Sequence, residues 1–88
     1  MTGKQKRYLR ALASIMPAVV MIGKGGLENP VIDSARAAII KRELIKVSLL
    51  QNTMEEPQEA AEVLAEQTGS TIIQVIGHTI VLYKQARN

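Results

Sequence analysis

Three glycines surround one lysine in the run Gly23-Lys24-Gly25-Gly26, which is the segment of this sequence best suited to binding a phosphate. Glycine accepts positive φ values and has no Cβ, so a phosphate can approach the backbone N–H groups directly. Lys24 adds a mobile cation, and the start of a following helix adds a favourable dipole of about 0.3–1 kcal/mol. A G-x-x-G loop of this kind can hold a nucleic-acid backbone. The alternative is a plain turn that needs positive φ.

This loop differs from the common nucleotide-binding motifs. G-x-x-x-x-G-K-[ST] is absent, and G-x-G-x-x-G is incomplete with no acid at the expected distance after it. No Ser/His/Asp or paired-carboxylate arrangement can be argued from the spacing, and His78 is expected in a hairpin turn. An enzyme would need metal-binding acids near the loop, where only Glu28 and Asp33 are close. We expect five further acids to form a solvated helix face: Glu55, Glu56, Glu59, Glu62 and Glu66.

Positive charge is concentrated in the first part of the chain. Residues 1–50 hold nine Lys or Arg against three acids, whereas residues 51–88 hold two against five. This asymmetry favours one face that is offered to a polyanion. Three cations lie within one helical turn, with no acid at i±4 to pair with them: Lys6, Arg7 and Arg10.

Further cations are expected near the end of a second helix and in the strand after it: Lys41, Arg42 and Lys46. Each could contact phosphate. Each could also lie on a solvated face, and the helix-terminal pair could simply complement the helix dipole.

The bulk composition limits what else the chain can be. Its 88 residues indicate one domain over residues 1–88, with no Cys and one His, so we expect no disulfide, metal site or cofactor. No apolar run approaches the roughly 18–20 residues that span a bilayer, and the basic start lacks the apolar stretch of a signal peptide. We therefore expect a cytoplasmic protein. Tyr8 and Tyr83 are the only aromatic residues, which argues against a base-stacking platform and favours binding through backbone and shape.

Periodicity and end signals predict seven elements. Thr2 is expected to cap a helix that runs to about residue 15, with Gln5, Leu9, Leu12 and Met16 on its apolar side. Asn29 is expected to cap a second helix with Pro30 at its first position, and Gly69 to end a third. The predicted elements are helices over residues 2–15, 29–42 and 56–69, and strands over residues 18–22, 43–50, 71–76 and 79–84.

These elements predict an α/β (α+β) domain of order α-β-α-β-α-β-β, with a four-stranded mixed sheet and helices packed on it. The first two strands can be parallel through a right-handed crossover. Gly77-His78 predicts a tight hairpin turn, most consistent with type II′, between the last two.

Four motifs in order resemble the CRM (chloroplast RNA splicing and ribosome maturation) domain family, and within it the stand-alone bacterial YhbY-type proteins. They are Gln5-Lys6-Arg7-Tyr8-Leu9-Arg10, Ile22-Gly23-Lys24-Gly25-Gly26-Leu27, Glu43-Leu44-Ile45-Lys46-Val47, and Gln74-Val75-Ile76-Gly77-His78 with Val81-Leu82-Tyr83-Lys84. The resemblance covers essentially the whole chain. It implies a fold similar to the C-terminal domain of bacterial translation initiation factor three, and association of bacterial members with precursors of the large ribosomal subunit.

The resemblance implies that the RNA-binding site includes the G-x-x-G positions 23–26 and the helix cations Lys6, Arg7 and Arg10. At Lys84 the sequence departs from the Arg that we expect after Leu-Tyr, which puts a bidentate phosphate contact there in doubt. The full predicted RNA-binding set is Lys6, Arg7, Arg10, Gly23, Lys24, Gly25, Gly26, Lys41, Lys46 and Lys84.

The sequence therefore predicts a non-catalytic, monomeric RNA-binding protein of ribosome assembly, with no small-molecule substrate and no membrane partner. In this interpretation the loop works with Lys46 and the first-helix cations beside it. The alternative is an adaptor that docks on a ribosome-associated protein through an unpaired apolar edge at Thr79-Ile80-Val81-Leu82-Tyr83.

Overall fold

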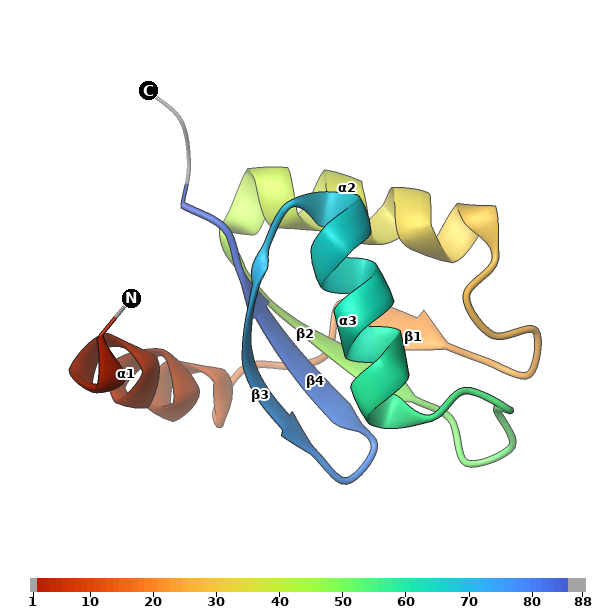
Figure 1. Cartoon of the computed structure of the whole chain (residues 1–88), viewed down its shortest axis with the longest axis horizontal. Coiled ribbons are helices and arrows are strands. Elements are labelled where there is room, and N and C mark those ends of the chain that lie inside the picture. Colours follow the sequence, from red (N-terminus) through yellow and green to blue (C-terminus); the bar gives the residue numbers. More distant parts are fainter. Residues whose placement is uncertain (1, 86–88) are drawn as a thin grey trace.

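The computed structural model describes residues 2–85 and contains the seven predicted elements in the predicted order. Local signals set most of their ends, since Thr2 caps the first helix and Gly69, at φ +68°, ends the third. The elements are α1 (Gly3–Ala13), β1 (Val20–Ile22), α2 (Asn29–Arg42), β2 (Leu44–Leu49), α3 (Pro57–Thr68), β3 (Thr71–Ile76) and β4 (Thr79–Tyr83) (Figure 1).

The four strands form one mixed sheet in the order β1-β2-β4-β3. β1 and β2 are parallel and joined through α2, whereas β4 is antiparallel to both of its neighbours. The predicted mixed sheet is thus confirmed. The unpaired edge expected at Thr79–Tyr83 is wrong, because β4 lies inside the sheet with Ile80, Val81 and Leu82 buried. The adaptor alternative loses its structural basis.

Helices cover both faces of the sheet. Alternating residues of β2 point to opposite faces, and each face has its own apolar cluster. On one face Ile45 and Val47 pack with residues of α2 and α3 such as Ile39 and Leu64. On the other face Leu44, Val81 and Ile73 pack with Ala13, Leu9 and Met16 at α1.

α1 begins as predicted and ends slightly earlier. The Thr2 hydroxyl accepts from the N–H of Gln5, and the Gln5 side chain accepts in return from the N–H of Thr2, which forms a capping box. Gln5 is therefore exposed in the cap and does not belong to the apolar side. Beyond Ala13 the N–H groups of Ile15 and Met16 bond three residues back, so the last turn tightens before Pro17.

Two other expectations need correction at the level of single residues. The cap of α2 is Glu28 rather than Asn29, and no side-chain hydrogen bond supports it. β1 is shorter than expected and is not buried on both faces, since Met21 is 55% exposed at the edge of the sheet.

At the hairpin, Gly77 has a φ of +53° and His78 has no positive φ, which agrees with the predicted type II′ turn.

Candidate nucleic-acid interface

The glycine-rich loop is a tight turn that follows β1. The N–H of Gly26 donates to the carbonyl of Gly23 at 3.0 Å, which leaves Lys24 and Gly25 at the two inner positions of the turn. Both are exposed. Across residues 2–85 no acceptor is within hydrogen-bonding range of the N–H groups of Lys24 and Gly25. Two neighbouring backbone donors and a lysine can therefore reach a phosphate from solvent.

Only part of the glycine pattern is required by geometry. Gly26 is buried with a φ of +74°, and a Cβ there would lie 2.6 Å from a carboxylate oxygen of Glu55. A Cβ on Gly25 would collide with the carboxylate of Glu28. A Cβ on Gly23 would make only an ordinary contact with Leu50. Positive φ is therefore used at one of the three loop glycines, and at Gly25 a Cβ would require only that the exposed Glu28 side chain move aside.

Glu55 holds this loop from the other side of the chain. Its carboxylate accepts from the backbone N–H of Leu27 at 3.1 Å, in a half-buried position. The expectation that Glu55 lies on a solvated helix face is wrong, because α3 starts only at Pro57. Sequence reasoning missed this role, since the two residues are 28 positions apart and no local pattern links them.

The loop is consequently less basic than its sequence suggests. Lys24 is its one cation, while the carboxylates of Glu28 and Glu55 lie against Gly25 and Gly26. A phosphate at this turn would be held mainly by backbone donors and by Lys24. Long-range attraction for a polyanion has to come from elsewhere on the surface.

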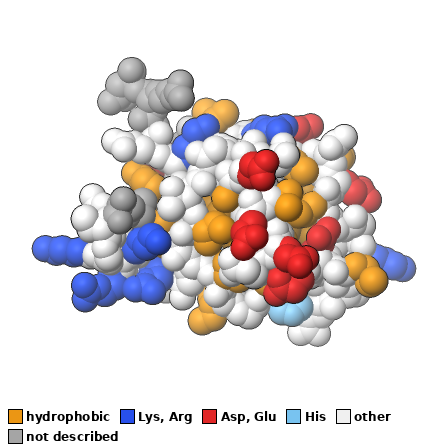
Figure 2. Space-filling view, in the orientation of Figure 1, with side chains coloured by type: hydrophobic (Ala, Val, Ile, Leu, Met, Phe, Trp, Pro, Cys, Tyr) orange, Lys and Arg blue, Asp and Glu red, His pale blue; other side chains and the backbone are white. Residues whose placement is uncertain are grey.

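The strongest source of positive charge is α1. Lys6, Arg7 and Arg10 are all exposed, and the single ion pair within residues 2–85 joins two residues of α2, Arg36 and Asp33. Figure 2 shows Lys and Arg side chains gathered at the α1 end of the molecule, away from the acidic side chains over α3. The α1 cations thus have no ionic partner in the described chain.

α1 and the loop do not form one continuous site. Figure 1 places α1 at one end of the long axis and the loop between β1 and α2 at the other, and this axis measures 34 Å. The expectation that the first-helix cations lie beside the loop is therefore wrong. Any RNA that uses both regions must extend along most of the molecule.

Lys46 joins α1 to the sheet. From β2, its Nζ donates to the carbonyls of Ala13 and Met16, both at 3.2 Å and half-buried. The Ala13 carbonyl is at the C-terminal end of α1, where a cation is favourable, and the Met16 carbonyl lies in the turn that follows. Lys46 lies in the middle of the sheet with its amino group directed at the end of α1, and not at the loop that it was expected to assist, and two of its three donors are already used.

Lys84 plays a similar part for α3. Its Nζ donates to the carbonyl of Thr68 at 3.1 Å, where α3 ends. A single ammonium suffices for this contact, so the lysine in place of arginine has a structural use here. Lys41 and Arg42 are exposed in the last turn of α2, and both the phosphate and the dipole interpretations stay open for them.

The remaining polar candidates make structural contacts. His78 lies in the hairpin turn as predicted, with its Nδ1 3.3 Å from the carbonyl of Leu49. Within residues 2–85 no group of three His, Asp or Glu side chains is arranged to hold a metal ion. In the same part of the chain, none of the helices combines the length and apolar character needed to cross a bilayer.

Comparison with known proteins agrees with this architecture. A protein of Bacillus subtilis named probable RNA-binding protein YqeI is 45% identical over 87 residues, which cover 99% of this chain and 91% of that protein. A Haemophilus influenzae protein named RNA-binding protein is 36% identical over 81 residues, covering 92% of this chain and 82% of its own.

A solved structure gives the same fold. The solution structure of a Staphylococcus aureus protein, described as a candidate RNA binder, superposes with a TM-score of 0.84 at 45% identity and covers 100% of this chain and 92% of its own. Residues 1–84 match the family model of the CRS1 / YhbY (CRM) domain. On this match and on the shared fold, the chain belongs to the CRM domain family.

Proposed function

We propose that this protein is a non-catalytic RNA-binding protein that contacts structured RNA through the turn at residues 23–26 and through the α1 cations. The observation that carries the proposal is the exposed pair of backbone donors at Lys24 and Gly25, which the fold leaves without an acceptor within residues 2–85. Backbone donors of this kind read a phosphate and not a base. The expected ligand is therefore defined by backbone shape.

The positive charge of α1 and the names of the related proteins both support RNA as the ligand. Exposed cations on α1 have no ionic partner in the described residues, and each phosphate that they neutralise would strengthen binding in a salt-dependent way. The relatives from Bacillus subtilis and Haemophilus influenzae are both named as RNA-binding proteins. A polyanion is thus the partner that both the surface and the family favour.

The finer part of the proposal concerns the RNA itself. The resemblance to YhbY-type proteins favours a precursor of the large ribosomal subunit, bound in the cytoplasm by a monomer during assembly. Catalysis is not part of the proposal, because the acids nearest the loop, Glu28 and Glu55, already lie against Gly25 and Gly26. The protein would act by holding RNA in place.

Filter binding tests this proposal with a fragment of large-subunit ribosomal RNA and an unrelated structured RNA of equal length. Lys24→Ala should weaken binding of the ribosomal fragment roughly three- to tenfold, because one phosphate contact is lost. Lys24→Arg keeps the cation and should recover most of the affinity. Val63→Ala, on the exposed side of α3, should bind as the unchanged protein does.

Two results would contradict the proposal. If the unchanged protein binds neither RNA at low salt, RNA is not its ligand. If it binds RNA but Lys24→Ala has the same affinity, the turn at residues 23–26 is not the contact. Equal affinity for the two RNAs would remove the ribosomal part of the proposal and leave the general RNA-binding part.

A further inference from the structure

A groove opens between the first turns of α1 and the adjoining ends of β3 and β4, far from the loop at residues 23–26. It has a volume of about 940 Å³, within the range of roughly 300–1,000 Å³ that is usual for sites that bind small molecules. α1 forms one wall, and the register pair Thr71 and Tyr83 forms the other. The lining residues are Lys4, Gln5, Tyr8, Leu9, Gly69, Thr71, Tyr83, Lys84 and Gln85.

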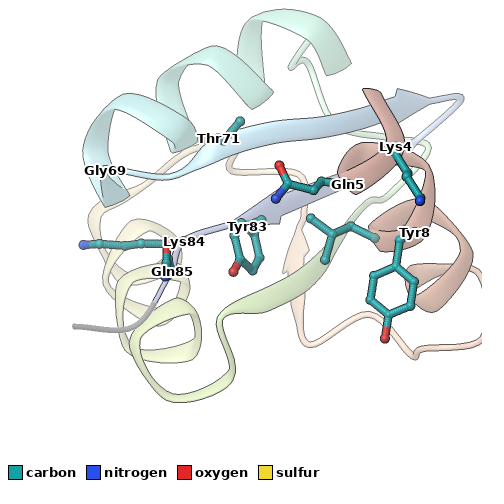
Figure 3. A pocket seen from close by; sticks show the side chains of 9 residues that line it. Lys4, Gln5, Tyr8, Gly69, Thr71, Tyr83, Lys84 and Gln85 are labelled. Atoms are coloured by element: carbon teal, nitrogen blue, oxygen red, sulfur yellow. The ribbon is translucent and has the colours of Figure 1, made fainter. Parts of the chain in front are cut away.

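Both aromatic residues of the protein line this one groove. Tyr83 is half-buried and packs against the apolar cluster under α1, which fixes its position. Tyr8 is 65% exposed, so its ring is available to a ligand. Figure 3 shows Tyr83 on the sheet side of the groove and Tyr8 on the α1 side, with the Tyr8 ring pointing outward from α1. The scarcity of aromatics in the sequence argued against stacking, but the fold places both where stacking is possible.

The polar lining of the groove favours an anion with hydrogen-bonding edges. Lys4 and Lys84 contribute two positive charges, and no acid is among the nine lining residues. The Nζ of Lys84 is held in place by the Thr68 carbonyl and keeps further protons for a ligand. Gln5 and Gln85 add amide groups that can both donate and accept. Leu9 is the one aliphatic side chain, so the groove is poorly suited to an apolar helix.

From this combination we propose that the groove binds an unpaired nucleotide of RNA, with its base stacked on Tyr8 and the phosphates on its two sides beside Lys4 and Lys84, whose side chains lie at opposite sides of the groove (Figure 3). Aromatic rings with adjacent cations are the usual means of holding single strands, and one stacked base changes affinity roughly five- to hundredfold. A base within a duplex has no free face and cannot stack in this way. This site rests on the proposed RNA-binding function and adds single-strand recognition to it.

The position of the groove defines what the whole RNA would look like. The groove and the turn at residues 23–26 lie toward opposite ends of the molecule (Figure 1). The turn contacts backbone of any conformation, whereas the groove needs a base that has left its helix. The best ligand is therefore a helix with an adjoining unpaired segment.

The test compares a blunt RNA duplex, a single strand of the same length, and the duplex with an unpaired extension, using the full chain throughout. Tyr8→Ala should weaken binding of the single strand and of the extended duplex at least fivefold. Its affinity for the blunt duplex should change less than twofold. Tyr8→Phe keeps the ring and should recover most of the lost affinity, which a merely structural role of the hydroxyl would not give.

A direct readout of stacking is available because the protein has no Trp. In Tyr83→Phe, Tyr8 is the one remaining tyrosine, so tyrosine fluorescence reports on that ring alone. Addition of the single strand should quench this fluorescence, and addition of the blunt duplex should quench it much less. Circular dichroism of each variant checks that the helix content is unchanged.

The outcomes separate this proposal from the function on which it rests. If Tyr8→Ala binds all three RNAs as the unchanged protein does, or loses affinity for all three equally, the groove does not select unpaired bases and the inference is overturned. RNA binding through the turn would still stand in that case. If the unchanged protein binds none of the three, both proposals fail together.

Discussion

The carboxylate of Glu55 accepts a hydrogen bond from the backbone N–H of Leu27 at 3.1 Å, and the same carboxylate lies against Gly26. The segment before α3 thereby fixes the glycine-rich turn, which belongs to the connection between β1 and α2. An acid occupies a backbone donor that a phosphate could otherwise use. The loop is tied at its base by this hydrogen bond and has an anion of its own beside the place where RNA is expected.

Removing the contact between Glu55 and Leu27 should lower the stability of the protein without weakening its binding of RNA. Glu55→Ala is expected to lower the free energy of unfolding by about 1–2 kcal/mol, because a half-buried N–H loses a charged acceptor. Glu55→Gln keeps an acceptor oxygen and should lose less than about 1 kcal/mol. Urea unfolding followed by circular dichroism measures both. Without the negative charge beside the loop, Glu55→Gln should bind RNA more tightly than the unchanged protein at low salt, and weaker binding would contradict this account.

Lys46 provides a second test, of a structural role against a binding role. Lys46→Met keeps the length of the side chain and removes both hydrogen bonds to the end of α1, so we expect a loss of about 1–2 kcal/mol in the free energy of unfolding. Lys24→Met, at an exposed position, should stay within about 0.5 kcal/mol of the unchanged protein. If Lys46→Met keeps its stability and loses RNA affinity, the sequence-based assignment of Lys46 to RNA is correct instead.

Glu43 gives a prediction about backbone strain. It follows α2 with a φ of +63° and a ψ of −49°, and it is the one non-glycine residue with positive φ within residues 2–85. Such a conformation costs a residue with a Cβ about 1 kcal/mol or more. Glu43→Gly should therefore unfold at higher urea concentration than Glu43→Ala, since both variants lose the same side-chain contacts. Equal midpoints would show that the surrounding structure removes the strain.

The α1 cations should determine how RNA binding depends on salt. The logarithm of the RNA association constant falls as the logarithm of the salt concentration rises. Replacing Lys6, Arg7 and Arg10 with Gln is expected to make this slope less steep by about 2–3, if each cation neutralises one phosphate. The matched control changes three exposed acids of α3 to Gln, which alters the net charge by the same amount in the opposite direction and on another face: Glu59, Glu62 and Glu66. This control should leave the slope unchanged. A change of slope of similar size and opposite sign in the control would mean that net charge alone governs binding.

Local chemistry explains why so much of the fold was predictable. Thr2 with Gln5, and Gly69 with its positive φ, mark helix ends through residues that are neighbours in the sequence. The alternation of Ile45, Val47 and Leu49 likewise identifies a strand with one face toward α2 and α3. Such signals depend on a few consecutive residues, so a sequence displays them directly.

The parts that could not be predicted depend on distant pairs. Lys46 finds its acceptors 30 and 33 residues away, and Glu55 finds Leu27 at a separation of 28. The place of β4 between β2 and β3 is also a matter of pairing, which strand patterns alone do not reveal. For the same reason the sequence-based prediction grouped the cations on one surface that the fold divides, and it did not anticipate that Lys46 and Lys84 are half-buried with carbonyl partners.

The interior place of β4 has a consequence for how the protein is made. β2 and β3 do not touch each other in the sheet, and each is paired with β4, whose residues come after both of them in the chain. A nascent chain that ends before residue 79 therefore contains β2 and β3 without the strand that pairs with both. Closure waits until Tyr83 has left the exit tunnel. Until then the nascent chain is accessible to chaperones and proteases. The time at which the protein can fold is therefore determined by the time at which β4 is synthesised.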